Sequence, residues 1–176
     1  MAAQKMFFSG FGGQGVLMIG RNIAYAAMLE GKEVTFLPAY GPEMRGGTAN
    51  CTVVVSDKPI SSPLIYDADL VCVMNLPSLL KFESMVKPDK YLFINNSIVT
   101  EPAKRNDIKV ENVKANEIAI ELGNEKAANM VMLGAIVRQT GVVSFDSIEH
   151  VMVKTFEGKK ASIIELNRKA LHAWAG

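Results

Sequence analysis

The residues with the clearest chemical potential form a glycine-rich stretch, FSGFGGQG, at positions 8–15. Gly10, Gly12 and Gly15 fit the pattern G-x-G-x-x-G, and Gly13 adds a fourth glycine. Glycines at these spacings allow a tight turn, let a phosphate approach the backbone, and let a helix pack closely against a strand. Backbone N–H groups at the start of the following helix would then face an anion. We therefore take the four glycines as candidate phosphate-binding residues.

The second half of the dinucleotide-binding pattern is missing. That pattern requires an acidic residue about 20 residues further on, at the end of the second strand, to bind the ribose. Leu37, Pro38 and Ala39 hold that place, and residues 34–42 contain no Arg or Lys for a 2′-phosphate. The sequence therefore favours a loop with a structural or interface role. Binding of another phosphate-bearing ligand is the second alternative, and binding of nicotinamide or flavin is the least favoured.

A second irregular stretch follows at residues 40–47, YGPEMRGG. Its prolines and glycines exclude a helix and fix the backbone closely, and tyrosine and arginine are favoured at interface hot spots. We predict that this loop contacts a partner or ligand; the alternative is a solvated loop in which two of its charged side chains pair. The candidate interface residues are Tyr40, Gly41, Pro42, Glu43, Met44, Arg45, Gly46 and Gly47.

Polar side chains also follow two of the apolar runs that we interpret as strands. Asn75 follows one run, and Asn95 and Asn96 follow the next. Ligands of open α/β sheets dock at the carboxyl ends of the strands, so these residues are candidates for ligand or partner contact. Asparagines also cap turns at such places, and the sequence alone leaves both interpretations open.

The elements that would position these residues follow from periodicity. Apolar residues at helical spacing predict a helix over 16–29, flanked by strands at 4–9 and 33–37, which is a βαβ unit with parallel strands. Residues 38–50 are predicted to be a loop. Further strands are predicted at 51–56, 69–75, 90–96 and 108–113, with a helix from Pro77 to about Val86, and helices after Ala115, the third of them capped by Ser144.

These elements predict one domain of residues 1–176. Its fold class is α/β, a Rossmann-like, mostly parallel open sheet flanked by helices over about 1–115, with a helical C-terminal part over about 116–176. The chain has 176 residues, 49% of them hydrophobic, and a net charge of +1. That balance argues against a nucleic-acid partner, and no apolar run reaches the roughly 20 residues of a membrane span. We expect a cytoplasmic protein.

Cysteine and histidine counts limit the cofactors that this chain could bind. Cys51 and Cys72 are two thiols in apolar runs, whereas an iron–sulfur cluster usually takes four. His150 and His172 lie far apart, and no carboxylate cluster has the spacing of metal ligands. We therefore predict buried free thiols and no metal site in this chain.

At this point the sequence resembles a family. GFGGQG, PAYGPEMRGGTANCTVVVSD, VMNLPSLLKF and the strand-end NNS look like the gamma subunit of 2-oxoacid:ferredoxin oxidoreductases of the 2-oxoglutarate, 2-oxoisovalerate or pyruvate type. The resemblance covers nearly the whole chain, and residues 40–47 are far more specific than the glycine loop. The rival interpretations are a free-standing nucleotide-binding dehydrogenase of the Rossmann type and a non-enzymatic binding protein.

The resemblance implies a role inside a larger complex. Such complexes convert a 2-oxoacid and coenzyme A to an acyl-CoA and carbon dioxide and reduce ferredoxin. Thiamine diphosphate, magnesium and 4Fe-4S clusters lie in partner subunits, so this chain would carry no cofactor and no catalytic side chain. It would dock on the alpha and beta subunits, with a ferredoxin-like delta subunit as a further partner, and would help to shape the coenzyme A site. Alone, it would expose an apolar docking surface and could form a homodimer.

Overall fold

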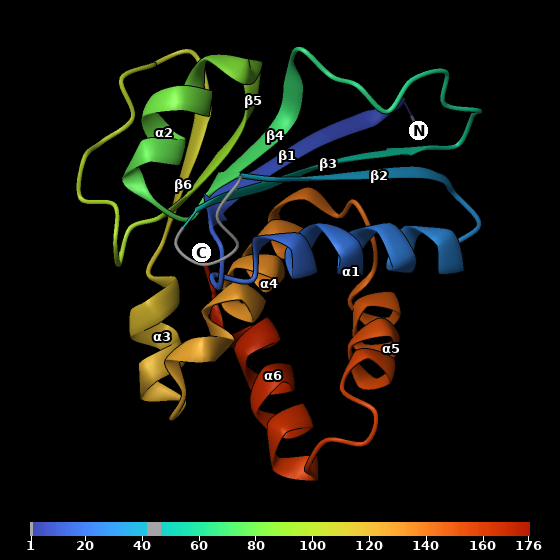
Figure 1. Cartoon of the computed structure of the whole chain (residues 1–176), viewed down its shortest axis with the longest axis vertical. Coiled ribbons are helices and arrows are strands. Elements are labelled where there is room, and N and C mark those ends of the chain that lie inside the picture. The colour runs from blue at the N-terminus through green and yellow to red at the C-terminus, as the bar shows by residue number, and fades with distance from the viewer. Residues whose placement is uncertain (1, 42–46) are drawn as a thin grey trace.

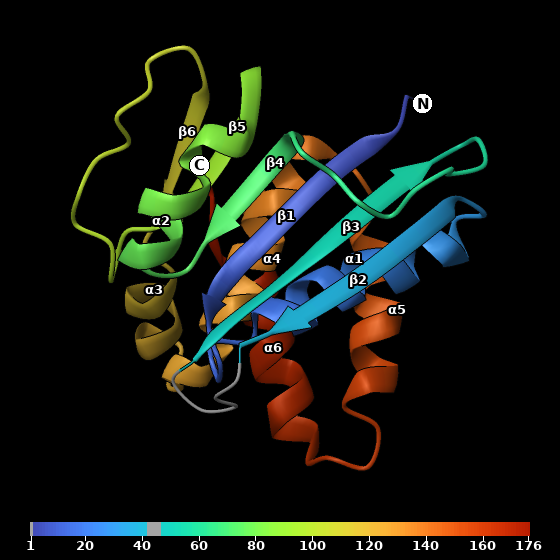
Figure 2. The ribbon, with the colours of Figure 1, turned by 45° about the horizontal axis from the view of Figure 1, so that its top comes forward.

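The computed structural model describes residues 2–41 and 47–176, which form a six-stranded sheet in the order β2-β3-β1-β4-β5-β6 (Figure 1). Figure 2 looks onto this sheet and shows the strands side by side. The strands are β1 (Gln4–Phe11), β2 (Glu33–Tyr40), β3 (Thr48–Ser56), β4 (Ala68–Val73), β5 (Val86–Asn95) and β6 (Lys109–Val113). The predicted α/β class is confirmed.

The sheet is mostly parallel, as predicted, but one strand runs the other way. β1, β4, β5 and β6 pair in parallel, whereas β3 is antiparallel to both of its neighbours, β1 and β2. β1 and β2 therefore point in the same direction but do not pair with each other. The short connection after β2 returns the chain as a hairpin, so β3 occupies the position that a simple βαβ unit would give to β2.

Two predicted loop boundaries are wrong. β2 continues to Tyr40 and β3 already begins at Thr48, so both strands extend into the predicted loop over 38–50. Pro38 is tolerated because β2 lies at the edge of the sheet, where a strand position without an N–H group loses no ladder bond on its open side. β5 likewise begins before the predicted residue 90.

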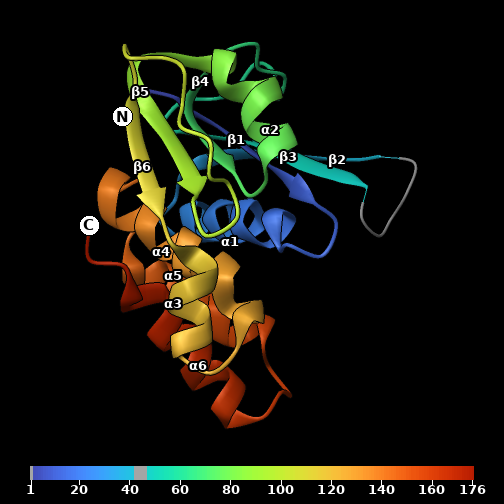
Figure 3. The same cartoon turned by 90° about the vertical axis from the view of Figure 1, so that its left-hand side faces the viewer.

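Helices cover both faces of the sheet unequally. They are α1 (Val16–Leu29), α2 (Leu76–Phe82), α3 (Ala115–Glu121), α4 (Ala128–Thr140), α5 (Phe145–Thr155) and α6 (Ala161–Ala173), with 3-10 turns η1 (Glu83–Met85) and η2 (Glu125–Ala127). Figure 1 and Figure 3 show α1 and α4 under the sheet, α5 and α6 further from it, and α2 on the opposite face. Among the helices of the described ranges, none is both long and apolar enough to cross a membrane.

The core forms two apolar clusters, one on each face of the sheet. Along β1, Met6 and Phe8 belong to the larger cluster with α1 and α4, whereas Phe7 between them belongs to the smaller cluster beside α2. This alternation follows from the two-residue side-chain period of a strand. Residues 128–137 of α4 are all buried, because α4 lies between the sheet and α6.

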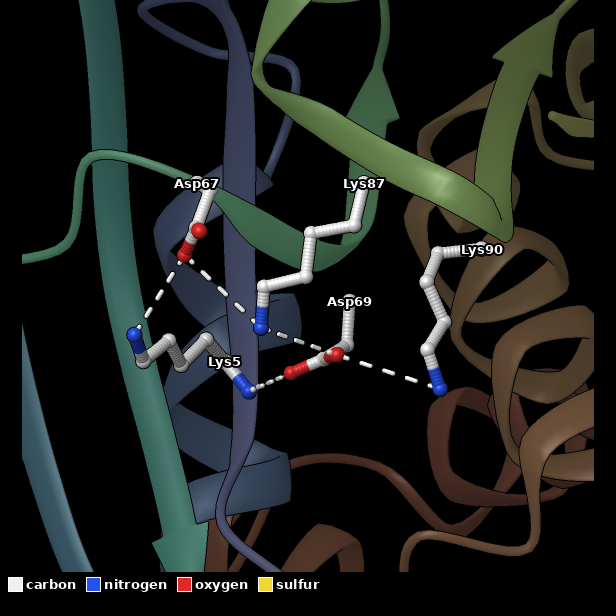
Figure 4. Close-up of polar contacts among 5 residues, drawn as sticks. All are labelled: Lys5, Asp67, Asp69, Lys87 and Lys90. Atoms are coloured by element: carbon white, nitrogen blue, oxygen red, sulfur yellow. Dashed lines mark hydrogen bonds and ion pairs between the residues drawn. The ribbon is translucent and has the colours of Figure 1, made fainter. Parts of the chain in front are cut away.

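An ion-pair network joins the amino ends of the three central parallel strands (Figure 4). The Asp69 carboxylate accepts a 2.9 Å hydrogen bond from the Lys5 backbone N–H and a 3.2 Å bond from Lys87 Nζ, with Lys90 Nζ 3.9 Å away. Asp67 pairs with the Lys5 ammonium at 3.3 Å. The network lies at the opposite end of these strands from the glycine loop and links the starts of β1, β4 and β5.

Candidate functional site

The glycine loop is a tight turn from β1 into α1, as the sequence predicts. Gly13 and Gly15 have φ angles of 98° and 75°, a left-handed conformation that glycine adopts without strain. Gly15 is also the residue before the first turn of α1, and a Cβ there would lie 2.5 Å from Asn129 Nδ2. At Gly10 a Cβ would lie 2.7 Å from Gln14 Oε1. Packing within the chain itself thus requires Gly10 and Gly15, whereas the backbone conformation alone favours glycine at position 13.

Gln14 holds this loop against the end of β4. Its Oε1 accepts a 2.7 Å hydrogen bond from the Phe11 N–H and a 3.3 Å bond from Asn75 Nδ2, and its Nε2 donates to the Met74 carbonyl at 2.9 Å. β1 leads into α1 on one face of the sheet and β4 into α2 on the other. Between such strands, open α/β sheets have the crevice that binds ligands. Here the chain's own Gln14 amide bridges the two sides of that crevice.

Gln14 was not among the candidate residues predicted from the sequence. The only signal was an amide within the glycine motif itself, GFGGQG, where a small residue would give the same turn. Because a glutamine side chain both donates and accepts, it can satisfy an N–H and a C=O group at once. That property suits it to join two backbone segments.

Asn75 acts as a helix cap in this structure. Its Oδ1 accepts a 2.9 Å hydrogen bond from the Ser78 N–H in the first turn of α2, while its Nδ2 donates to Gln14. The residue is buried, with 2% of its surface exposed. Of the two interpretations left open by the sequence, the described contacts of Asn75 match the turn-capping one.

Asn95 and Asn96 lie at the end of β5 next to the C-terminal helical part. Asn95 Nδ2 donates a 2.8 Å hydrogen bond to Asn116 Oδ1, and Asn116 in turn donates to Glu125 at 2.8 Å. The Oδ1 atoms of Asn95 and Asn96 are buried and have no hydrogen-bond partner among the described residues. A small hollow of about 190 Å³ lies beside this chain of amides; its lining residues are Gly13, Gln14, Met74, Asn116, Glu125, Lys126, Ala128 and Asn129.

Sequence reasoning therefore missed the contribution of the C-terminal helices to this edge of the sheet. Asn129 interrupts an otherwise apolar helical run, AANMVM, and Asn116 lies in the first turn of another helix; these two amides were the available signal. Asn129 is buried, packs on Gly15, and donates from Nδ2 to Met18 Sδ at 3.5 Å. The glycine loop is thus enclosed by α4 as well as by β4.

The base of the second candidate loop touches the glycine loop. Gly12 N–H donates a 2.9 Å hydrogen bond to the Gly47 carbonyl, and Gly41 N–H donates to the Thr48 carbonyl at 2.8 Å. Tyr40, at the end of β2, is 64% exposed. The remaining candidates, Pro42, Glu43, Met44, Arg45 and Gly46, lie outside the described residues. The structure therefore brings Gly12, Gly13 and Gly15 together with Tyr40 and Gly47 around one hollow of about 270 Å³.

The strand order weakens the dinucleotide interpretation further. In a dinucleotide-binding unit, the end of the second strand lies beside the glycine loop, where its acid reaches the ribose. Here β3 lies between β2 and β1, so β2 runs two strand spacings from β1, about 10 Å, and the residue that it brings to the hollow beside the glycine loop is Tyr40 rather than an acid. In addition, one N–H group of the loop, that of Gly12, already donates to Gly47.

The metal-ligating side chains of residues 2–41 and 47–176 do not suit a metal ion or an iron–sulfur cluster. Cys51 and Cys72 are both fully buried, and they flank Phe8 on neighbouring strands, so β1 separates them. Burial raises the pKa of the Cys51 thiol to about 12 and raises the pKa of Cys72 as well. Both are free thiols. Within the described ranges, no three His, Cys, Asp or Glu side chains gather where they could hold a metal ion.

These features define a doubly wound α/β chain with a crevice that Gln14 bridges and the exposed Tyr40 side chain at the end of β2. Residues 5–174 match the family described as pyruvate ferredoxin/flavodoxin oxidoreductase. The chain belongs to this family, and the resemblance found in the sequence is confirmed at that level.

Individual relatives of the chain are consistent with this family. The ketoisovalerate oxidoreductase subunit VorA of Methanothermobacter marburgensis is 38% identical over 97% of this chain, but the match covers 36% of that relative, so the chain spans about a third of its length. The pyruvate/ketoisovalerate oxidoreductases common subunit gamma of Pyrococcus abyssi is 34% identical over 93% of this chain and 90% of the relative. The solved gamma subunit of a keto/oxoacid ferredoxin oxidoreductase from Geobacter sulfurreducens superposes with a TM-score of 0.80 at 30% identity, covering 96% of this chain and 94% of that one.

Proposed function

We propose that this chain is the gamma subunit of a multi-subunit 2-oxoacid:ferredoxin oxidoreductase. Such a complex converts a 2-oxoacid and coenzyme A to an acyl-CoA and carbon dioxide and passes the electrons to ferredoxin. The observation that carries the proposal is the family match over nearly the whole chain, residues 5–174, supported by relatives of similar length that are named as gamma subunits.

In this proposal the chain carries no catalytic side chain and docks on the alpha and beta subunits through residues 40–47. Support comes from Tyr40, a large aromatic side chain that is 64% exposed at the end of an edge strand. The hydrogen bond between Gly12 and Gly47 further connects the base of this loop to the turn between β1 and α1. Loops held by a rigid scaffold are common places for recognition.

The cofactors of the complex are assigned to other subunits. Thiamine diphosphate, when bound, stabilises the carbanion left by decarboxylation, and 4Fe-4S clusters carry the electrons onward. Magnesium would accompany the diphosphate. Two buried thiols on separate strands support the assignment of the clusters to partners such as a ferredoxin-like delta subunit. A single domain of 1–176 and a cytoplasmic complex stay predictions.

Contribution to coenzyme A binding is the second part of the proposal. The hollow of about 270 Å³ beside Gly13 and Tyr40 is open to the first turn of α1, whose leading N–H groups have no acceptor within the helix. Selection of the 2-oxoacid is assigned to the partner subunits. This agrees with the name of the Pyrococcus relative, a gamma subunit common to pyruvate and ketoisovalerate oxidoreductases.

Reconstitution with purified alpha and beta subunits tests the docking proposal. Coenzyme A-dependent oxidation of pyruvate, 2-oxoglutarate and 2-oxoisovalerate is measured with and without this chain, using ferredoxin as acceptor. We expect activity to require the chain, and we expect Tyr40→Ala and Arg45→Glu to weaken co-purification. Tyr66→Ala is the matched control, because Tyr66 is 90% exposed in the connection between β3 and β4. Full activity without this chain would overturn the proposal.

The rival interpretation, a free-standing dehydrogenase, is tested separately. Fluorescence titration of the purified chain with NADH should show no binding well below millimolar concentrations, because the acid that would hold the ribose is missing after β2. Tight binding of NADH would favour the rival interpretation. In that case the loop over 40–47 would be expected to tolerate Arg45→Glu without loss of activity.

A further inference from the structure

A groove of about 630 Å³ runs between α1 and α5, away from the glycine loop. Along α1 it exposes three large apolar side chains: Tyr25 is 51% exposed, Met28 58% and Leu29 54%. Contiguous exposed apolar surface of this kind marks interaction sites on soluble proteins. The lining residues are Arg21, Tyr25, Met28, Leu29, Val151, Lys154 and Thr155.

The charged side chains that line the groove are all positive. Its lining contains the cations Arg21 and Lys154 and no carboxylate. Across residues 2–41 and 47–176, neither cation forms an ion pair, in contrast to Arg105, which pairs with Asp107 at 2.6 Å. An apolar floor with unpaired positive charges on both walls complements an acidic, amphipathic occupant.

The groove is continuous with the loop that we propose as the docking surface. At 3.6 residues per turn, the outward-facing side chains of α1 fall within an arc of about 120° and form one stripe along the helix. At its amino end this stripe borders the hollow beside Tyr40 and Gly47, and at its carboxyl end it forms one wall of the groove. The residues of the stripe are Leu17, Met18, Arg21, Tyr25, Met28 and Leu29.

We infer that the α1–α5 groove binds an acidic amphipathic helix of the alpha or beta subunit, as a second docking surface of the same complex. This inference rests on the proposed function. A helix laid along α1 would place apolar anchors at i, i+3 or i+4, and i+7 against Tyr25, Met28 and Leu29, with α5 forming the other wall of the groove. Asp or Glu side chains on its flanks would face Arg21 and Lys154.

Charge also distinguishes this occupant from a second copy of the chain. In a twofold homodimer through this face, the same surface meets itself. Arg21 and Lys154 would then lie opposite the same two cations of the copy, and like charges across an interface are unfavourable. The groove therefore fits an acidic partner better than it fits itself.

The first experiment measures binding of the chain to the purified alpha–beta assembly by biolayer interferometry at two salt concentrations. The double variant Arg21→Glu/Lys154→Glu should raise Kd at least about tenfold and remove the weakening by salt that the unaltered chain shows. The matched control is Lys81→Glu/Lys104→Glu, for which Kd should change less than about twofold. Both lysines are exposed: Lys81 lies in α2, on the opposite face of the sheet (Figure 1), and the Lys104 backbone N–H donates to Glu83, the residue after α2. Thermal melting of each variant checks that it folds.

The outcomes separate this inference from the proposed function. If the unaltered chain does not bind the assembly, the proposed function fails. If it binds and the groove variant binds equally well with the same salt dependence, only the inference about the groove fails.

A photo-crosslinking amino acid in place of Tyr25 then identifies the occupant. We expect a cross-link, in the reconstituted complex, to a helical peptide of the alpha or beta subunit with Asp or Glu beside apolar residues. A cross-link to a second copy of this chain would overturn the choice of occupant. A small amphiphile that stays bound to the chain in native mass spectrometry, and that the Arg21→Glu/Lys154→Glu variant no longer binds, would also overturn the choice of occupant.

Discussion

Replacing Gln14 by alanine should loosen the junction between the glycine loop and the end of β4. The side chain makes three hydrogen bonds, to the Phe11 N–H, the Met74 carbonyl and Asn75 Nδ2. Each bond is worth about 0.5–1.5 kcal/mol. Because the site is only part-buried, water can replace some of them, and we take the lower half of the range. The free energy of unfolding should fall by about 2 kcal/mol, which lowers Tm by about 4–8 °C for a chain of this size.

The assay is urea denaturation followed by circular dichroism, with Gln139→Ala as the matched control. Gln139 makes one exposed hydrogen bond, 2.9 Å to Glu111 Oε1, so its loss should cost under about 0.5 kcal/mol. Gln14→Glu should be no better than Gln14→Ala, because a carboxylate oxygen cannot donate to the Met74 carbonyl. If Gln14→Ala unfolds within about 0.5 kcal/mol of the unaltered chain, Gln14 is not the link that we describe.

Three further predictions concern stability. A Cβ at Gly134 would overlap the Leu171 carbonyl oxygen and lie 2.7 Å from its carbon, so Gly134→Ala should destabilise by about 2 kcal/mol in urea titrations; because the obstacle is backbone, adding Leu171→Ala should not rescue it. Partial burial raises the pKa of Glu30, but hydrogen bonds, first from Lys32, outweigh this and hold the pKa at about 2, below its ordinary 4.5. The stabilisation of the folded chain by the ionised Glu30 carboxylate is present above about pH 4.5 and is lost as pH falls towards 2. Glu30→Gln should therefore lower the free energy of unfolding by about 1 kcal/mol at pH 6 and by little at pH 2.5. Asp69→Asn should lower the free energy of unfolding by about 1–2 kcal/mol. Asp67→Asn should change it by much less, because the Asp67 side chain is 56% exposed. Equal effects would show that Asp69 contributes no more to the ion-pair network than Asp67 does.

Local patterns predicted the elements well. The helix over 16–29 was predicted with its observed bounds, because apolar spacing, the glycine turn before it and Gly31 after it all act within the segment. Ser144 caps α5 as predicted, accepting a hydrogen bond from the Ser147 N–H. Such signals depend on neighbours in sequence, which is why the sequence contains them.

Pairing between distant strands was not predictable in the same way. Whether β2 or β3 lies beside β1 depends on which strand fills the sheet best, and Cys51, Val53 and Val55 of β3 are all fully buried there. The apolar run at 51–56 predicted a strand but neither its neighbours in the sheet nor its direction. The same limit applies to the candidate site, because Asn116 and Asn129 reach the glycine loop through the packing of α3 and α4.

The order of strands also has a consequence for synthesis on the ribosome. β1 is made before the other five strands of this sheet, yet both of its sheet neighbours lie far along the chain, β3 at residues 48–56 and β4 at 68–73. Until those residues leave the exit tunnel, the amino-terminal strand has no native partner for its backbone groups, and its apolar run is open to other contacts. The β2–β3 hairpin is local and can form first, after which β1 adds to its open edge. A strand at the centre of the sheet is therefore made early but can pair only with strands that come later in the chain.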